Sequence, residues 1–138
     1  MSSLKQDIKT KSLHLHVLEK IIVLNTSLFF LGIILNLLGF NLLDWFSLPY
    51  RFSEVLSHPW SIITYGFLHH SLGHLFFNML VLYFIAQSFA NLFKPRLSFK
   101  IYILCVIFGG LAFVFVSMLF PNLLRINGPL VGASAGVR

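Results

Sequence analysis

The chain has 138 residues, of which 57% are hydrophobic and only 10% charged, and its formal net charge is +6. About a quarter of the residues in a soluble globular domain are charged, so this composition excludes such a domain, and the high apolar content excludes a disordered chain. Cys105 is the one cysteine, which excludes an intrachain disulfide and a cysteine-built zinc site. The sequence therefore predicts an integral membrane protein.

The first predicted span follows a basic N-terminal segment. No charged residue occurs over residues 21–43, and a membrane-spanning helix needs about 20 mostly apolar residues. The run is too long for a cleaved signal peptide, and no alanine precedes it to form a small-residue cleavage site. We expect residues 1–20 to form a cytoplasmic segment and residues 21–138 to form a membrane domain.

Two further spans and the start of a fourth follow along the chain. Residues 55–68 mix polar and aromatic residues and are expected at the membrane interface, whereas residues 71–93 form a continuous apolar run. The third span is predicted over residues 101–120, before Pro121, which cannot continue a helix without losing a hydrogen bond. From about residue 129 the chain is apolar again and predicts the first turns of a fourth span. The fold class is thus an all-α, polytopic membrane helix bundle with three complete spans.

The positive charges indicate how the bundle is oriented. Most of them lie in the N-terminal segment and in the loop between the second and third spans: Lys5, Lys9, Lys11, Lys20, Lys94, Arg96 and Lys100. The loops on the other side hold only Arg51 and Arg125. Because cytoplasmic loops carry the excess of Lys and Arg, we expect a cytoplasmic N terminus in a multi-pass protein. Orientation in the lipid bilayer explains the charge without a nucleic-acid partner, and the lack of an Arg/Ser-rich leader favours a bacterial plasma membrane.

Polar residues open the second span. His70, His74 and Asn78 recur at i, i+4 and i+8, which predicts one shared helix face, and His69 is expected to point elsewhere. Polar groups inside a bilayer are costly and usually face a protein interior or a water-filled cavity. They could be packing contacts between helices. His70 and His74 also have the spacing of helical zinc ligands, but no carboxylate lies nearby in the sequence.

A Gly-x-Ser-x-Gly pattern opens the predicted fourth span, with Ser134 between Gly132 and Gly136. In soluble hydrolases this motif presents a serine nucleophile, and two glycines at this spacing also let membrane helices approach closely. With the N terminus inside, His74 and Ser134 both lie within about 5–10 Å of the outer boundary, given a rise of ~1.5 Å per residue. Two polar spots at equal depth indicate a shared cavity and make Ser134 a candidate nucleophile.

In this combination the sequence resembles the rhomboid intramembrane serine proteases. The resemblance rests on four features that follow one another along the chain: Pro59-Trp60, His69 with His74-x-x-x-Asn78, Gly109-Gly110, and Gly132-Ala-Ser-Ala. It implies that Ser134 is the nucleophile and that His74 and Asn78 donate hydrogen bonds to the oxyanion. It further implies that His69 orders the outer loop, and Trp60, Gly132 and Gly136 are expected to support the site.

The resemblance also implies the reaction: a Ser–His dyad, needing no cofactor or metal, cleaves transmembrane protein substrates near the outer membrane face. In the rhomboid family the catalytic histidine belongs to the sixth span. We therefore expect residues 1–138 to be the N-terminal part of a longer protease and to be inactive alone. The alternative, from a different class, is a rhomboid-like membrane protein without protease activity that binds transmembrane clients.

Overall fold

Three long helices dominate the computed structural model, which describes residues 16–120 and 129–132. They are α2 (Val17–Leu37), α6 (Leu72–Leu92) and α7 (Pro95–Leu119), and each is long and apolar enough to cross a membrane. Within the described ranges the only extended pairing is an isolated bridge between Leu48 and Leu130. The predicted all-α fold class with three membrane spans is confirmed.

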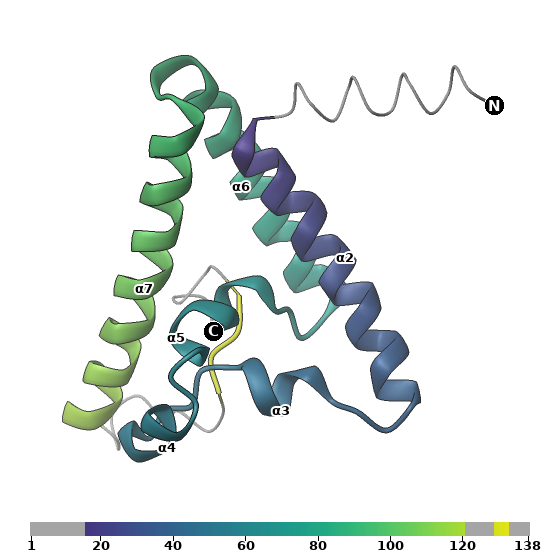
Figure 1. Ribbon diagram of the computed structural model, residues 1–138, viewed down its shortest axis with the longest axis vertical. Coiled ribbons are helices and arrows are strands. Elements are labelled where there is room, and N and C mark those ends of the chain that lie inside the picture. The colour runs from purple at the N-terminus through teal and green to yellow at the C-terminus, as the bar shows by residue number, and fades with distance from the viewer. Residues whose placement is uncertain (1–15, 121–128, 133–138) are drawn as a thin grey trace.

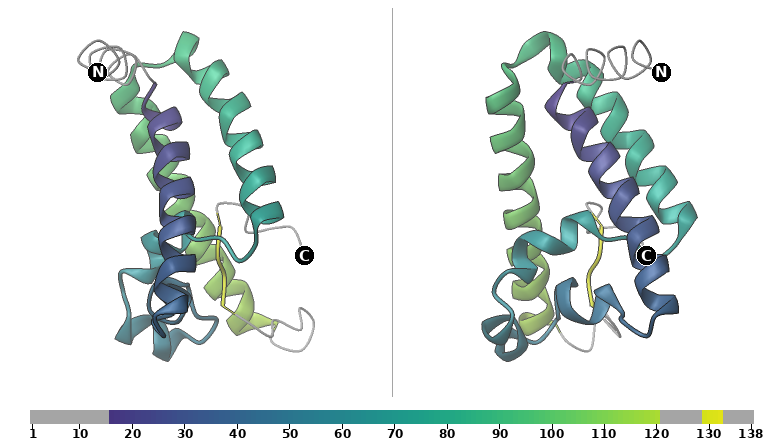
Figure 2. Two further views of the ribbon diagram at one scale, coloured as in Figure 1. Left: turned by 90° about the vertical axis from the view of Figure 1, so that its right-hand side faces the viewer. Right: turned by 45° about the vertical axis from the view of Figure 1, so that its right-hand side comes forward.

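The three long helices form a wedge. Figure 1 shows α2 beside α6, with α7 joined to α6 at one end and diverging from it toward the other, and the right-hand view of Figure 2 agrees. Helix α2 contacts both α6 and α7. Four short helices fill the wide end of the wedge: α3 (Leu42–Phe46), α4 (Phe52–Ser57), α5 (Ser61–Thr64) and the 3-10 helix η1 (Tyr65–Phe67).

Helix α2 is shifted toward the N terminus relative to the predicted span over residues 21–43. It begins at Val17 because His16 and Glu19 form a capping box, in which the His16 amide donates to Glu19 Oε2 at 2.8 Å. It ends at Leu37, shortly before Gly39 adopts a φ of +85°. Hydropathy alone could not place these ends, because the caps are polar or conformational signals.

The second and third long helices differ in how closely they follow their predictions. Helix α6 agrees with the predicted residues 71–93, since the Ser71 side chain caps it by accepting from the His74 amide at 3.2 Å. Helix α7 begins at Pro95 instead of residue 101, because proline favours the first helical position. Its first turns therefore carry the charges that mark the loop, Arg96 and Lys100.

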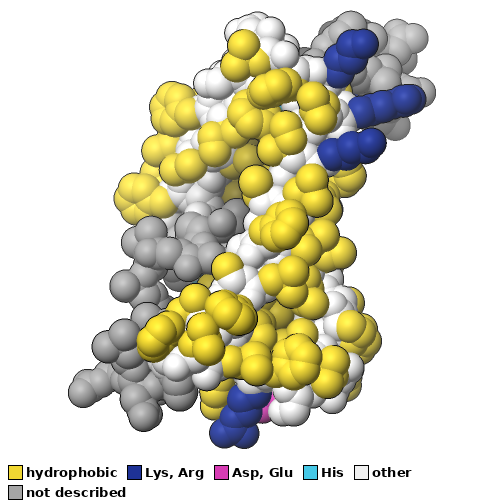
Figure 3. Space-filling view, turned by 90° about the vertical axis from the view of Figure 1, so that its left-hand side faces the viewer, with side chains coloured by type: hydrophobic (Ala, Val, Ile, Leu, Met, Phe, Trp, Pro, Cys, Tyr) yellow, Lys and Arg dark blue, Asp and Glu magenta, His cyan; other side chains and the backbone are white. Residues whose placement is uncertain are grey.

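Apolar side chains cover the outside of the long helices, as expected for a surface that faces lipid or further helices. Figure 3 shows one such face, with a broad hydrophobic surface between positive side chains at the two ends of the molecule. Phe76, Phe84, Phe108 and Phe115 are each at least 60% exposed. The described positive charges thus lie outside a continuous apolar belt, which is the arrangement that a bilayer requires.

The segment before α6 packs against the middle of α7. The Tyr65 hydroxyl donates to the Val106 carbonyl oxygen at 2.7 Å, and the ring packs against Gly109 and Gly110. At 1.5 Å per residue, Gly110 is about 14 Å from the end of α7. Two glycines thus open a notch that admits the tyrosine ring, and the interfacial position of residues 55–68 stays a prediction.

The predicted helical start at residue 129 is also wrong for the residues that the structure describes. Residues 129–132, drawn in yellow within the wide end of the wedge in Figures 1 and 2, form no helical turn, and Leu130 lies in an isolated bridge. Leu130 exchanges two backbone hydrogen bonds with Leu48, at 2.7 and 3.0 Å. Pairing with Leu48, in the segment between α2 and α6, therefore replaces the first helical turn expected there.

Candidate active site

The candidate site begins with two side chains on successive turns of α6. His74 and Asn78 are half-buried, while Leu75 and Met79 beside them are buried in the core. The i, i+4 spacing puts the imidazole and the amide on one face of the helix, as predicted. Both groups can donate hydrogen bonds from neighbouring positions.

His69, and not His70, extends this polar face. The His69 and His74 rings lie edge to face, with 5.2 Å between their centroids. His70 is exposed and precedes α6, which starts only after Ser71. The prediction that His70 shares the helix face was wrong because the cap at Ser71 ends the helical periodicity before it reaches His70.

Gly132 brings the C-terminal segment onto His74 and Asn78. Its amide donates to the Tyr65 carbonyl oxygen at 2.8 Å, and its φ is +87°. A Cβ atom added to Gly132 would lie 2.8 Å from His74 Nε2 and 2.9 Å from Asn78 Nδ2. The backbone can approach the two side chains this closely only because this residue is glycine.

Several polar atoms of the site are buried without a hydrogen-bond partner among the described residues. They include Asn78 Nδ2 and both ring nitrogens of His69. Leaving a buried donor or acceptor unsatisfied costs about 1–3 kcal/mol, so each such group in a native structure calls for an explanation. A bound ligand or water would supply the missing partners.

His69 is held neutral. Burial lowers its pKa to about 4, with smaller contributions from the neighbouring His74 and His70 rings. At neutral pH its ring therefore offers one donor and one acceptor nitrogen.

Contacts within the chain between α2 and α6 position the residues around His69. Trp60 Nε1 donates to the Trp45 carbonyl oxygen at 3.0 Å, and Thr64 Oγ1 donates to the Phe46 carbonyl oxygen at 2.8 Å. These bonds tie α5 to α3, and Tyr65 continues the connection to α7. Thr64 and Tyr65 were missed from the sequence because single hydroxyl residues in a loop carry no periodic signal.

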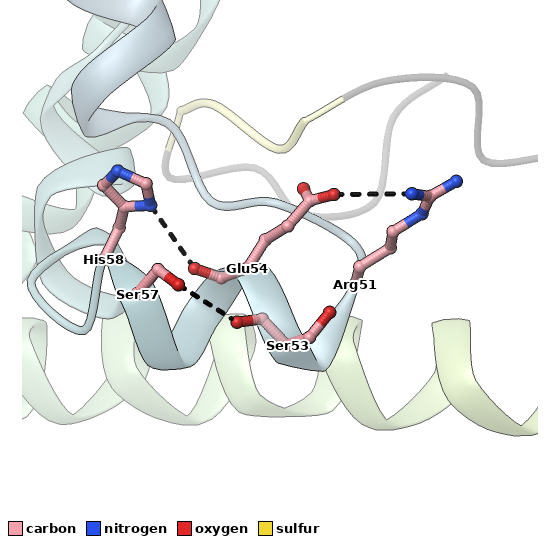
Figure 4. A network of polar contacts seen from close by, with 5 residues as sticks. All are labelled: Arg51, Ser53, Glu54, Ser57 and His58. Atoms are coloured by element: carbon pink, nitrogen blue, oxygen red, sulfur yellow. Dashed lines mark hydrogen bonds and ion pairs between the residues drawn. The ribbon is translucent and has the colours of Figure 1, made fainter.

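A second polar cluster, on α4, lies apart from this site. Figure 4 shows Arg51 paired with Glu54 at 3.7 Å, and His58 Nδ1 at 3.4 Å from the Glu54 carbonyl oxygen. Ser57 Oγ donates to the Ser53 carbonyl oxygen at 3.4 Å. The Arg51–Glu54 ion pair is solvent-exposed and contributes little to stability. The Glu54 carboxylate is engaged here on α4, and no bond links it to His69 or His74 in the described part of the chain.

Two predicted site residues, Ser134 and Gly136, lie outside the described residues, as do Arg125 and most of the N-terminal segment 1–20. Over residues 16–120 and 129–132, no group of three or more His, Cys, Asp and Glu side chains comes together to hold a metal ion. His69 and His74 face each other, and the described part of the chain brings no third ligand of these types to them.

Comparison with known proteins gives one match. The family model described as Rhomboid domain matches residues 56–138, which is more than half of the chain. No curated protein and no solved structure matches the chain. The matched range begins at the end of α4 and includes α5, η1, α6, α7 and the Gly132 segment.

Proposed function

The chain belongs to the rhomboid family of membrane proteins, and on that premise we propose that it is an intramembrane serine endopeptidase with Ser134 as its nucleophile. The contact of Gly132 with His74 and Asn78 carries the proposal. Ser134 follows Gly132 by two residues, and two residues span at most about 7 Å. The serine is therefore tethered within reach of both side chains.

His74 and Asn78 are proposed as the oxyanion-hole donors. When a serine oxygen attacks a peptide carbonyl, negative charge develops on the carbonyl oxygen, and donors aimed at that oxygen lower the barrier. Asn78 Nδ2 is a buried donor with no partner among the described residues, so it is available for such a bond. In soluble enzymes, one donor of this kind is worth about 2.7–4 kcal/mol.

The general base is proposed to be a histidine of a later span, as the family resemblance implies. A serine hydroxyl is a weak nucleophile until a neighbouring base removes its proton. His69 and His74 are assigned to positioning and donation, so neither takes this role. Experiments on activity should therefore express the entire open reading frame that encodes these 138 residues.

The proposed substrates are transmembrane proteins cleaved near the outer face of a bacterial plasma membrane. His74 and Asn78 lie in the first two turns of α6, at the end opposite to Lys94 and Arg96. If the positive end is cytoplasmic, as the charge distribution favours, the site opens toward the outer side. Water reaches a shallow site more easily than it reaches the bilayer centre.

Labelling by a fluorophosphonate probe tests the assignment of the nucleophile. We expect the wild-type protein and Ser53→Ala, a change on the exposed helix α4, to be labelled, and Ser134→Ala to remain unlabelled. Labelling that persists in Ser134→Ala would contradict the assignment. Absence of labelling in the wild type would favour the alternative of a non-proteolytic protein that binds transmembrane clients.

A further inference from the structure

Cationic side chains gather at the end of the bundle where α2 begins and α6 meets α7. We call this surface the basic rim, and it comprises the exposed residues Lys20, Lys94, Arg96 and Lys100. Gln87 Nε2 in α6 donates to Glu19 Oε1 in α2 at 3.0 Å, which holds the two helices together beside Lys20. Figure 3 shows positive side chains gathered at the upper end of the molecule, where the hydrophobic surface ends.

The positive charge of the basic rim is not neutralised within the described part of the chain. The single ion pair over residues 16–120 and 129–132 joins Arg51 to Glu54, at the opposite end. Among the described carboxylates only that of Glu19 lies at the end of the rim, and it accepts hydrogen bonds from the His16 amide and from Gln87. The excess of positive charge therefore suits an anionic partner.

The length of α7 places part of the rim at the level of the lipid headgroups. Its 25 residues span about 38 Å at 1.5 Å per residue, whereas the hydrocarbon core of a bilayer is about 30 Å thick. The difference of about 8 Å corresponds to about five residues of helix, which is the distance from Pro95 to Lys100. No charged residue occurs from Ile101 to Leu119. With this apolar part in the hydrocarbon core, Arg96 and Lys100 lie at the depth of the lipid phosphates.

Exposed apolar side chains lie close to these cations. Leu92 is 70% exposed at the end of α6, and Leu97 and Phe99 are 45% and 44% exposed in the first turns of α7. A free phosphate ion or an acidic protein segment would pair with the cations and leave this apolar surface uncovered. A phospholipid supplies both a phosphate and acyl chains, so it matches the two kinds of surface together.

We propose that the basic rim is a binding site for an anionic phospholipid, with the lipid phosphate on Arg96 and Lys100 and the acyl chains on the neighbouring apolar side chains. These two cations are four residues apart on α7, so they share a helix face and can contact one headgroup. A guanidinium can bind two phosphate oxygens at once. The site lies at the end of α6 opposite to His74 and Asn78, and it does not depend on the proposed protease activity.

The selectivity for lipids beside the rim tests the proposal. In the full-length protein carrying Cys105→Ser and Asn91→Cys, the new cysteine is labelled with the neutral fluorophore bimane. Phosphatidylcholine nanodiscs then contain a small fraction of either phosphatidylglycerol or phosphatidylcholine with a nitroxide on the acyl chain. We expect the labelled phosphatidylglycerol to quench bimane several-fold more efficiently than the labelled phosphatidylcholine at the same mole fraction. Equal quenching by the two lipids would overturn the inference.

Removing the two cations should remove the selectivity. We expect Arg96→Gln combined with Lys100→Gln to bring the ratio of the two quenching efficiencies close to one. Arg96→Lys combined with Lys100→Arg keeps both charges and should keep a ratio above one. Arg51→Gln, at the opposite end, is the matched control and should leave the ratio as in the wild type. A wild-type ratio in the double glutamine variant would overturn the assignment to Arg96 and Lys100.

Two measurements on the protein without changes in the rim keep the test decisive if the double glutamine variant does not insert. At a salt concentration of about 1 M the Debye length falls to about 3 Å, so the quenching ratio should approach one. A ratio that salt leaves unchanged would exclude the charges of the rim as its cause. Soluble glycerol phosphate at millimolar concentration should not displace the labelled lipid, and displacement would show a site for phosphate alone and overturn the lipid.

These outcomes are independent of the proposed function. None of the quenching measurements involves Ser134, so labelling that persists in Ser134→Ala would overturn the nucleophile and leave the lipid site standing. Equal quenching by the two lipids would overturn the lipid site and leave the nucleophile standing.

Discussion

At the scale of single residues, Gly132 determines how close the C-terminal segment lies to α6. Two independent features require glycine there: a φ of +87° and the contacts with His74 and Asn78. The sequence identified Gly132, His74 and Asn78 from their spacing. It did not show that they touch, because that contact depends on the hydrogen bond from Gly132 to Tyr65, far away in the sequence.

Gly132→Ala is expected to impair the site. A left-handed conformation costs an L-residue about 1–2 kcal/mol, and the added methyl group would also displace His74 or Asn78. We expect a lower thermal transition and loss of most fluorophosphonate labelling. Gly73→Ala is the matched control, because a Cβ at Gly73 in α6 meets nothing within 4 Å. Unchanged labelling of Gly132→Ala would argue against the contact.

His69 should make stability depend on pH. Its pKa falls from 6.5 to about 4 on folding, so between these values the unfolded chain binds more protons than the folded chain. Protonation of His69 therefore does not reduce the free energy of unfolding above pH 6.5, and it reduces that free energy progressively as the pH falls toward 4. We expect the thermal transition of the purified protein to drop between pH 7 and pH 5, and to drop less in His69→Phe.

The exposed His70 provides the control for this effect. His70→Gln should keep most of the pH dependence of the wild type, because His70 is exposed and makes the smallest of the three contributions that lower the pKa of His69. His74, whose ring faces His69, is left unchanged in both variants. If His69→Phe and the wild type lose stability equally on acidification, protonation of a group other than His69 causes the loss.

At the scale of elements, the glycine notch of α7 positions the segment between α2 and α6. The Tyr65 side chain enters the notch while the Tyr65 carbonyl oxygen holds the Gly132 amide at 2.8 Å. One residue thus links α7 to the segment that leads to Ser134. Burial raises the pKa of Tyr65 to about 12, so its hydroxyl remains a neutral donor.

Closing the notch should displace the loop. A Cβ atom at Gly110 would lie 2.9 Å from Tyr65 Cε1 and 3.0 Å from Leu48 Cδ2. We expect Gly110→Val to lower the thermal transition strongly and to reduce labelling of Ser134. Tyr65→Phe keeps the ring and loses one hydrogen bond, worth about 0.6 kcal/mol between membrane helices, so its effect should be small. A Gly110→Val variant as stable as the wild type would contradict the role of the notch.

The sequence predicted the long helices well and the elements between them poorly. Spans can be recognised from hydropathy because every spanning helix must present apolar side chains to lipid. The exact ends depend on caps such as the His16–Glu19 pair, and the packing of the segment before α6 depends on Tyr65 entering a notch in α7. The course of residues 129–132 depends on a partner, Leu48, that no local pattern reveals.

At the scale of the whole molecule, charge separates the two ends of the bundle. Lys20, Lys94, Arg96 and Lys100 belong to the end where α2 begins and α6 meets α7, while Arg51 lies at the other end. The proposed orientation places the first end in the cytoplasm. The site then faces outward.

Cysteine accessibility measures this orientation. In a Cys105→Ser background, we expect Ser53→Cys on α4 to react with a membrane-impermeant maleimide in intact cells. Asn91→Cys near the end of α6 should react only after permeabilisation. Both positions are exposed, so access to the residue differs only by the side of the membrane. The reverse pattern would place the candidate site in the cytoplasmic half.

The most direct test of the proposed site is the steady-state cleavage of a single-span substrate by Asn78→Ala in the full-length protein. An oxyanion donor acts mainly in the transition state, so we predict kcat to fall about 10²–10³-fold with little change in KM. Ser88→Ala, a change on the exposed face of α6, should leave both constants unchanged. A rise in KM with kcat unaltered in Asn78→Ala would contradict an oxyanion role and the site built on it.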